Sequence, residues 1–290
     1  MIPASFDYSS PTTLSHAIAL LREHGPDAKI LAGGQSLIPL MKLRMASPKH
    51  VIDLNRITGL AYVREENGFL TIGALTREAD VDGSELIRAK YPLLADTAGV
   101  IGDPLVRNMA TVGGNLAHAD PANDHGATML AYGASVVATG PGGTRTIPVT
   151  GLFTGVFTTS LNADEILTEI RIPIPPPGSG GAYFKVERKV GDFAAAAVAA
   201  QLTLAGGVCK GVGIGLTNVG PTPIKATRAE QALEGQAPSE ENVKRASALA
   251  AEQSEPADDL RGSAEYKRSL VRVLTGRALR QAIARAKGEH

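Results

Sequence analysis

The chain has 290 residues, 43% of them hydrophobic and 20% charged, and its formal net charge is +0. This length suits about two domains with sizeable cores, and the absence of a basic block argues against nucleic acid as a partner, because phosphate binding needs clustered lysine and arginine. With one cysteine, Cys209, the chain can form no intrachain disulfide and cannot ligate an iron–sulfur cluster by itself.

Residues 1–13 do not have the pattern of a signal or transit peptide. The sequence contains no run of about 18 apolar residues, so we expect no membrane-spanning helix and a cytoplasmic location. Aromatic residues make up only 4% of the chain and tryptophan is absent, which argues against a base-stacking platform.

The residue pattern from Ser10 to residue 54 predicts helices alternating with short apolar strands. Ser10 and Pro11 are suited to begin a helix, and Gly25-Pro26 is suited to end it. Buried strands are expected at 29–32 and 51–54, with a short helix from Leu37 between them.

The second segment predicts antiparallel strands with helices between them. Asn67-Gly68 lies between two β-rich runs and predicts a hairpin over 60–76. The remaining elements expected here are helices at 76–82 and at 84–98 broken by Pro92, a hairpin over 135–149 and a strand at 165–172.

The proline-rich stretch 173–178 is the clearest linker and the expected domain boundary. After it we expect strands at 182–186, 193–204 and 208–219 and helices at 226–234, 239–252 and 263–286. The alanine run in 193–204 also suits a helix, but glycine-containing turns on both sides favour a strand. The last helix should bury Leu270, Val273, Leu274, Leu279 and Ile283 on one side, and His290 is expected to be disordered.

Two glycine pairs flanked by small or polar residues are the most informative feature. They lie in Ala32-Gly33-Gly34-Gln35-Ser36 and in Thr111-Val112-Gly113-Gly114-Asn115. Glycine permits close backbone approach to a ligand, and successive N–H groups can form a nest for a phosphate. Together the two pairs could hold a pyrophosphate. The Rossmann pattern Gly-x-Gly-x-x-Gly is absent.

Residues 100–124 are polar and interrupted by glycine and proline, which is typical of a binding loop. His118, Asp120 and His125 could be drawn as a metal site, but nothing in their spacing supports one, and loop capping by Asp120 and Asp124 is the simpler interpretation. Asp124 can also accept from a ribose hydroxyl or a flavin edge. No Ser-His-Asp order or paired-carboxylate cleft is present, so a hydrolase is not expected.

Several motifs along the chain occur together in one known family. They are Ile2-Pro3-x-x-Phe6-x-Tyr8, Ala32-Gly33-Gly34-Gln35-Ser36-Leu37, Val51-Ile52-Asp53-Leu54, Thr111-Val112-Gly113-Gly114-Asn115, Asp120-Pro121-x-Asn123-Asp124 and Lys189-x-Gly191-Asp192. Through them the chain resembles, over nearly its full length, the FAD-binding medium subunits of the molybdenum hydroxylases, and it is most similar to those of aerobic carbon monoxide dehydrogenases. Xanthine dehydrogenase has an equivalent domain.

The resemblance implies an α+β fold. Residues 1–176 would form an FAD-binding domain of the vanillyl-alcohol-oxidase (PCMH) type, with subdomains of about 1–56 and 57–176. Residues 177–290 would form a smaller C-terminal domain, a three-stranded antiparallel sheet with helices.

The resemblance also implies which residues hold FAD. They are Ala32, Gly33, Gly34, Gln35, Ser36, Leu37, Ile101, Ala110, Thr111, Gly113, Gly114, Asn115, Asp124, Leu167, Lys185 and Phe193. Phe193 departs from the pattern, since the carbon monoxide enzymes carry tyrosine after Gly-Asp. A hydrogen bond near the flavin would be missing here, which leaves the substrate and the acceptor open.

The implied function is electron transfer in a cytoplasmic oxidoreductase that can associate with the inner face of the cell membrane. A large partner subunit would carry the molybdenum cofactor and a small one the [2Fe-2S] clusters, in a dimer of heterotrimers. Electrons would pass through FAD on this chain to an acceptor such as a quinone. The alternatives are a medium subunit of an aldehyde or N-heterocycle hydroxylase, a stand-alone FAD oxidase and a scaffold that has lost its cofactor.

Overall fold

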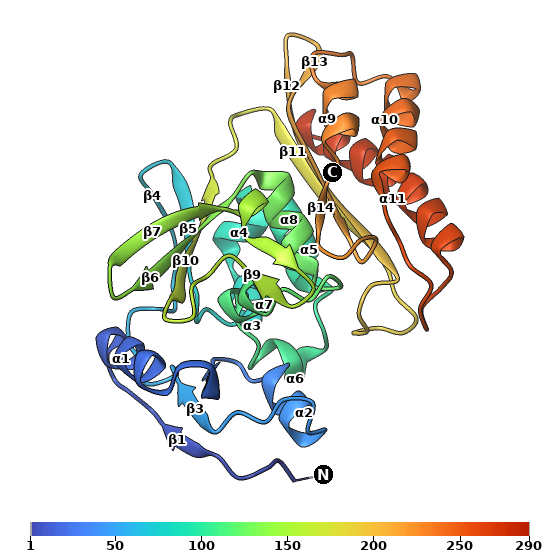
Figure 1. The fold of residues 1–290 in the computed structure, drawn as a ribbon. Helices are drawn as coiled ribbons and strands as arrows, with labels where there is room; N and C mark the ends of the chain where they lie inside the picture. The colour runs from blue at the N-terminus through green and yellow to red at the C-terminus, as the bar shows by residue number, and fades with distance from the viewer. Residues whose placement is uncertain (1, 290) are drawn as a thin grey trace.

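The computed structural model describes residues 2–289, so His290, expected to be disordered, lies outside the described residues. An N-terminal layer contains a three-stranded parallel sheet in the order β1-β3-β2 (Figure 1). Its elements are β1 (Asp7–Ser9), α1 (Leu14–His24), the 3₁₀ turn η1 (Gly25–Asp27), β2 (Ala28–Leu31), α2 (Leu37–Lys42) and β3 (His50–Asp53). Thr13, not the expected Ser10, caps α1, because its hydroxyl accepts the His16 N–H at 3.3 Å.

A five-stranded antiparallel sheet in the order β4-β5-β10-β6-β7 follows. Its strands are β4 (Val63–Glu66), β5 (Phe69–Gly73), β6 (Ser135–Gly140), β7 (Gly143–Pro148) and β10 (Ile166–Pro173). Both hairpins and the strand predicted from the sequence are confirmed. A 3₁₀ turn η2 (Val149–Gly151) and a small hairpin of β8 (Phe153–Gly155) and β9 (Thr158–Thr159) precede β10.

Six helices lie between β5 and β6. They are α3 (Glu78–Gly83), α4 (Glu85–Lys90), α5 (Pro92–Gly99), α6 (Pro104–Arg107), α7 (Val112–His118) and α8 (Asp124–Tyr132). Helices α6 and α7 correct the expectation of one long loop over residues 100–124. Asp103 and Thr111 each cap a helix through the side chain, accepting from Val106 N at 2.8 Å and from Gly114 N at 3.2 Å.

The C-terminal sheet has the order β11-β12-β13-β14 and is antiparallel. Its elements are β11 (Ser179–Val186), β12 (Ala196–Ala205), β13 (Val208–Thr217), β14 (Ile224–Lys225), α9 (Thr227–Leu233), α10 (Glu240–Gln253) and α11 (Ala264–Ala286). The three expected strands are confirmed, with the two-residue β14 added at the edge. In α11, Val273 is 46% exposed and Val271 takes its expected place in the core.

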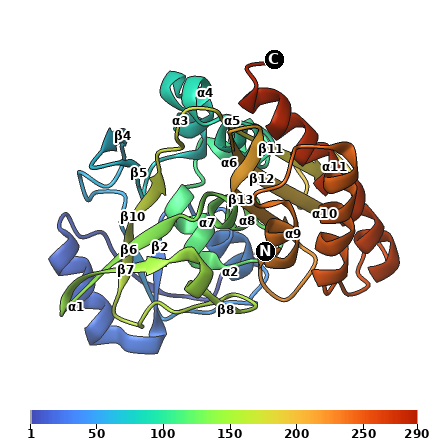
Figure 2. The ribbon, with the colours of Figure 1, turned by 90° about the horizontal axis from the view of Figure 1, so that it is seen from above.

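This sheet is covered by helices on both faces (Figure 2). Ala197 and Ala199 of β12 belong to the same core as α5 and α8, whereas Ala196 and Val198 belong to the core with α10 and α11. Successive residues of a strand point to opposite faces, which explains why β12 is apolar throughout. The sheet is therefore an inner layer between α5 and α8 on one face and α10 and α11 on the other.

Glycines bring helix backbones close to this sheet. A Cβ at Gly215 of β13 would lie 2.0 Å from the carbonyl oxygen of Ala127 in α8, and one at Gly180 of β11 would lie 2.1 Å from that of Ala282 in α11. Only glycine permits such contacts. No helix within residues 2–289 is both long and apolar enough to cross a membrane.

Candidate FAD-binding site

The two glycine segments lie in contact. A Cβ at Gly33 would lie 2.2 Å from the carbonyl oxygen of Met109 and 2.8 Å from the Cα of Ala110. One at Gly114 would lie 3.8 Å from the Cβ of Ala32. The loop after β2 and the segment Thr111–Asn115, which caps and opens α7 and is called the second loop below, are far apart in the sequence but form one surface of glycine and small side chains.

The first loop offers unused hydrogen-bond donors. Within residues 2–289, no acceptor is present for the consecutive backbone N–H groups from Gly33 to Leu37, and the Ser36 hydroxyl also has no partner. Gly34 has a φ of +76°, which turns the backbone as a nest requires. A row of backbone donors in this conformation suits an anion such as a phosphate.

The second loop contributes differently. The Val112 N–H donates to Thr76 O at 3.1 Å and the Gly113 N–H to Ala74 O at 3.0 Å. The N–H groups of Gly114 and Asn115 are satisfied by the side chain and backbone of Thr111. From Val112 to Asn115 the second loop therefore keeps no unused N–H group, whereas the row of consecutive unused backbone donors belongs to the first loop.

Asn55 and Arg77, which the sequence analysis did not identify, join the two loops. The Asn55 amide donates to Ala32 O at 2.8 Å and its carbonyl oxygen accepts from Arg77 at 2.6 Å. The Arg77 guanidinium also donates to Met109 O. The only sequence signal was polar Asn55 just after the apolar strand that ends at Asp53.

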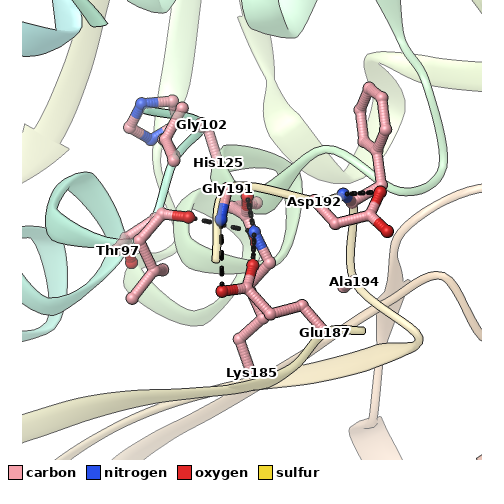
Figure 3. Close-up of polar contacts among 12 residues, drawn as sticks. Thr97, Gly102, His125, Lys185, Glu187, Gly191, Asp192 and Ala194 are labelled. Atoms are coloured by element: carbon pink, nitrogen blue, oxygen red, sulfur yellow. Dashed lines mark hydrogen bonds and ion pairs between the residues drawn. The ribbon is translucent and has the colours of Figure 1, made fainter. Parts of the chain in front are cut away.

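Asp124 and Lys185, both predicted site residues, form a buried ion pair, of which Lys185 is labelled in Figure 3. Asp124 accepts from Lys185 Nζ at 3.1 Å and from the Tyr183 hydroxyl at 2.6 Å, and Lys185 also donates to Val100 O at 3.0 Å. Burial raises the pKa of the Asp124 carboxyl, while Lys185 and Tyr183 partly oppose that shift. The pair fixes the start of α8 to β11 and to the backbone beside Ile101.

The other predicted residues lie in different surroundings. Ile101 and Leu167 are only 7% and 6% exposed, while the Phe193 ring is 42% exposed at the end of the loop after β11. The Ala110 carbonyl accepts the Glu78 N–H at 3.0 Å, and the Asn115 carbonyl accepts the Asn123 side chain at 3.0 Å. Gln35 and Leu37 belong to the first loop.

The predicted capping role of Asp120 is confirmed, since its carboxylate accepts the Ala122 N–H at 2.9 Å. His125 pairs with Glu78 at 2.8 Å, and both side chains are fully buried. Burial alone lowers the pKa of His125, but the Glu78 carboxylate outweighs burial, so this pKa is raised. Among the described residues, no group of three or more possible ligands could hold a metal ion.

The donor set fits FAD. The first loop has the unused N–H groups that a pyrophosphate needs, and the glycine and small residues of the second loop lie beside it. Phe193 follows Asp192 in the loop that leads to β12 of the C-terminal sheet, and its aromatic side chain is partly exposed at the surface.

Comparison with known proteins identifies the family. The family model described as "FAD binding domain in molybdopterin dehydrogenase" matches residues 4–175, and "CO dehydrogenase flavoprotein C-terminal domain" matches residues 181–282. The chain is 46% identical to the carbon monoxide dehydrogenase medium chain of Afipia carboxidovorans over 99% of this chain and 100% of the relative.

Further relatives agree. The chain is 38% identical to subunit alpha of the 6-hydroxypseudooxynicotine dehydrogenase complex of Paenarthrobacter nicotinovorans, over 99% of this chain and 97% of the relative. A chain in a solved structure of carbon monoxide dehydrogenase from Hydrogenophaga pseudoflava superposes with a TM-score of 0.96 at 47% identity, covering 98% of this chain and 99% of that one. The predicted family and fold class are confirmed: the chain belongs to the FAD-binding medium subunits of the molybdenum hydroxylases.

Proposed function

We propose that this chain carries FAD in a molybdenum-containing dehydrogenase of the carbon monoxide type and transfers electrons out of that enzyme. The observation that carries the proposal is the row of unused N–H groups from Gly33 to Leu37 beside the Thr111–Asn115 loop. The 46% identity to a carbon monoxide dehydrogenase medium chain supports this type of enzyme.

The residues proposed to hold FAD have distinct tasks. The N–H groups of Gly33, Gly34, Gln35, Ser36 and Leu37 would bind the pyrophosphate, and the segment Ala110–Asn115 would line its other side. Ile101, Leu167 and Phe193 would exclude water around the flavin ring. The Asp124–Lys185 pair would hold the intervening backbone in place. When bound, FAD would supply the redox chemistry, so no side chain of this chain need act as acid or base.

The family to which the chain belongs implies partner subunits, and the composition agrees with this. One cysteine, Cys209, is fully buried and cannot ligate a cluster alone. By the family resemblance we assign the [2Fe-2S] clusters to a small subunit and the molybdenum cofactor to a large subunit, in a dimer of heterotrimers that reduces an external acceptor such as a quinone. The cytoplasmic location expected from the sequence stays a prediction.

We also propose the division into residues 1–176 and 177–290, with subdomains near 1–56 and 57–176. In its support, β3 ends at Asp53, β10 ends at Pro173 and the next sheet begins at Ser179.

The test is purification from the native source with all accompanying subunits, followed by an absorbance spectrum and mass identification of the released cofactor. FAD bands on top of iron–sulfur absorbance, with two further subunits and bleaching by carbon monoxide, are expected. A yellow protein without partners that acts as an oxidase by itself would contradict the proposal.

A second candidate is the medium subunit of an N-heterocycle hydroxylase. The 38% identity to a subunit of 6-hydroxypseudooxynicotine dehydrogenase supports this candidate, and Phe193 departs from the carbon monoxide pattern. Bleaching of the flavin by an N-heterocycle and not by carbon monoxide would select this candidate.

A further inference from the structure

Phe193 lies at the end of the loop that joins β11 to β12. Within this loop, Gly191 has a φ of +83°, and a Cβ there would lie 3.1 Å from the carbonyl carbon of Gly102. The loop therefore rests directly on the backbone next to Ile101, which is proposed to line the flavin pocket. Figure 3 shows Gly102 and Gly191 in the same close-up as Lys185 and Asp192.

Asp192 fixes the backbone of this loop. One of its carboxylate oxygens accepts from Arg188 at 3.1 Å, and the other accepts the Phe193 N–H at 2.8 Å and Arg261 Nη2 at 3.2 Å. Burial by itself raises the pKa of Asp192, but the hydrogen bonds from Arg261, Arg188 and the Phe193 N–H more than offset it, so this pKa lies below its usual value. Asp192 is therefore a charged residue shared by two arginines.

The two arginines differ in what else they touch. The Arg188 side chain is 54% exposed and belongs to the same loop as Asp192. The Arg261 side chain is 24% exposed, and its guanidinium carbon lies 5.5 Å from the centre of the Phe193 ring. A guanidinium placed over an aromatic face is attracted to it, and its planar shape also packs against the ring. Of these two arginines, only Arg261 restrains the ring itself.

Arg261 lies in a hydrogen-bonded segment between α10 and α11. Asp259 accepts the Arg261 N–H at 2.8 Å and the ammonium of buried Lys267 at 2.7 Å. Asp258 accepts the Ala264 N–H at 2.6 Å at the start of α11. The position of the guanidinium is thus set by the C-terminal part of the chain, whereas the ring it contacts belongs to the loop beside Ile101.

The ring needs such a restraint. Phe193 is 42% exposed, so burial fixes it only in part, and it has no hydroxyl that could hold it through a hydrogen bond. Its backbone is fixed by Asp192, but rotation about the side-chain bonds is limited mainly by what packs on the ring faces.

We propose that Arg261 is a positioning residue for the cofactor site: its guanidinium holds the Phe193 ring at the flavin, and this contact couples the segment between α10 and α11 to FAD retention. The inference rests on the proposed function. It adds Arg261, which is far from both glycine loops in the sequence, to the residues that shape the cofactor site.

The test measures the rate of FAD release from the enzyme purified with its partner subunits, followed as the rise in flavin fluorescence after dilution. Arg261→Gln is expected to accelerate release about fivefold, consistent with a lost cation–π contact of about 1 kcal/mol. Arg188→Gln is the matched control, because it also removes a guanidinium from Asp192 but leaves the ring contact intact. It is expected to release FAD at the wild-type rate.

A double-mutant cycle separates positioning from a general structural effect. In a Phe193→Ala background, Arg261→Gln should cause no further acceleration if it acts through the ring. The inference is overturned if Arg261→Gln releases FAD at the wild-type rate or at the rate of Arg188→Gln. It is also overturned if Arg261→Gln accelerates FAD release by the full amount in the Phe193→Ala background. In either case the proposed function still stands. A wild-type enzyme purified without FAD would overturn both.

Discussion

Gly33 lies against the carbonyl oxygen of Met109 so closely that a Cβ at position 33 would be 2.2 Å from that oxygen. Real Cβ atoms do not approach an oxygen this closely, so a side chain at position 33 would force the backbones apart. The contact sets the spacing between the loop with unused N–H groups and the loop that begins at Thr111. It therefore determines the shape of the proposed pyrophosphate site.

Gly33→Ala should consequently reduce FAD content by tenfold or more. The added methyl group meets backbone atoms that cannot move aside without shifting the second loop, and overpacking of this kind costs about 1–3 kcal/mol. FAD per chain is measured by absorbance after gel filtration. Gly142→Ala is the control, since a Cβ at that position meets nothing within 4 Å. Normal flavin content in Gly33→Ala would show that the spacing of the loops does not matter.

Arg77→Gln should weaken FAD binding about tenfold and have a smaller effect on folding. The substitution removes the guanidinium that donates to both Met109 O and Asn55, and so releases the link between the two loops. Titration of the flavin-depleted complex with FAD gives the dissociation constant. Arg22→Gln, on the exposed face of α1, is the control. An equal loss of FAD affinity in Arg77→Gln and Arg22→Gln would contradict a role of Arg77 in joining the loops.

Local patterns in the sequence predicted most of the fold. The hairpin at Asn67-Gly68 and the helices after residue 226 have local causes, namely turn chemistry and apolar periodicity. The alanine run of β12 was ambiguous by propensity, and it is a strand because helices cover both of its faces. Residues 100–124 were expected as a loop because their short helices depend on caps at Asp103 and Thr111.

The site was predicted less completely. The glycine loops could be identified, because glycine pairs next to strands have a physical meaning without further context. Asn55, Arg77, Tyr183 and Arg261 could not, because each acts through contacts across long stretches of chain. No sequence pattern indicated that the N–H groups from Val112 to Asn115 are consumed within the protein. Such pairings depend on the packed structure.

Glu78→Gln should destabilise the protein in a pH-dependent way. Because Glu78 raises the pKa of buried His125, the folded state binds this proton more tightly than the unfolded state. The stabilisation is therefore complete below the unfolded pKa of about 6.5 and is lost as pH rises through the higher folded pKa. Removing one partner of a buried pair costs about 3–5 kcal/mol.

The measurement is thermal unfolding of wild type and Glu78→Gln between about pH 6 and 9. The gap between the two melting temperatures should be largest at low pH and narrow as pH rises. His16→Gln, at an exposed position of α1, should follow the wild-type curve. A gap that stays constant with pH would mean that the His125 proton contributes nothing to stability.

Lys185→Met should destabilise the protein by about 3–5 kcal/mol, because it leaves the Asp124 carboxylate buried without its cation. The Lys185 and Asp124 side chains are only 3% and 7% exposed, so little water can replace the lost ammonium. Adding Asp124→Asn should restore part of that stability, since a neutral amide can still accept the Tyr183 hydroxyl bond and needs no counter-charge. Denaturant unfolding of both single variants and the double variant gives the coupling energy.

Lys49→Met, which removes an ammonium from a side chain that is 78% exposed, should leave the unfolding free energy at the wild-type value. Additive losses in the cycle would mean that Lys185 and Asp124 stabilise the protein independently and that the pair does not act as a unit.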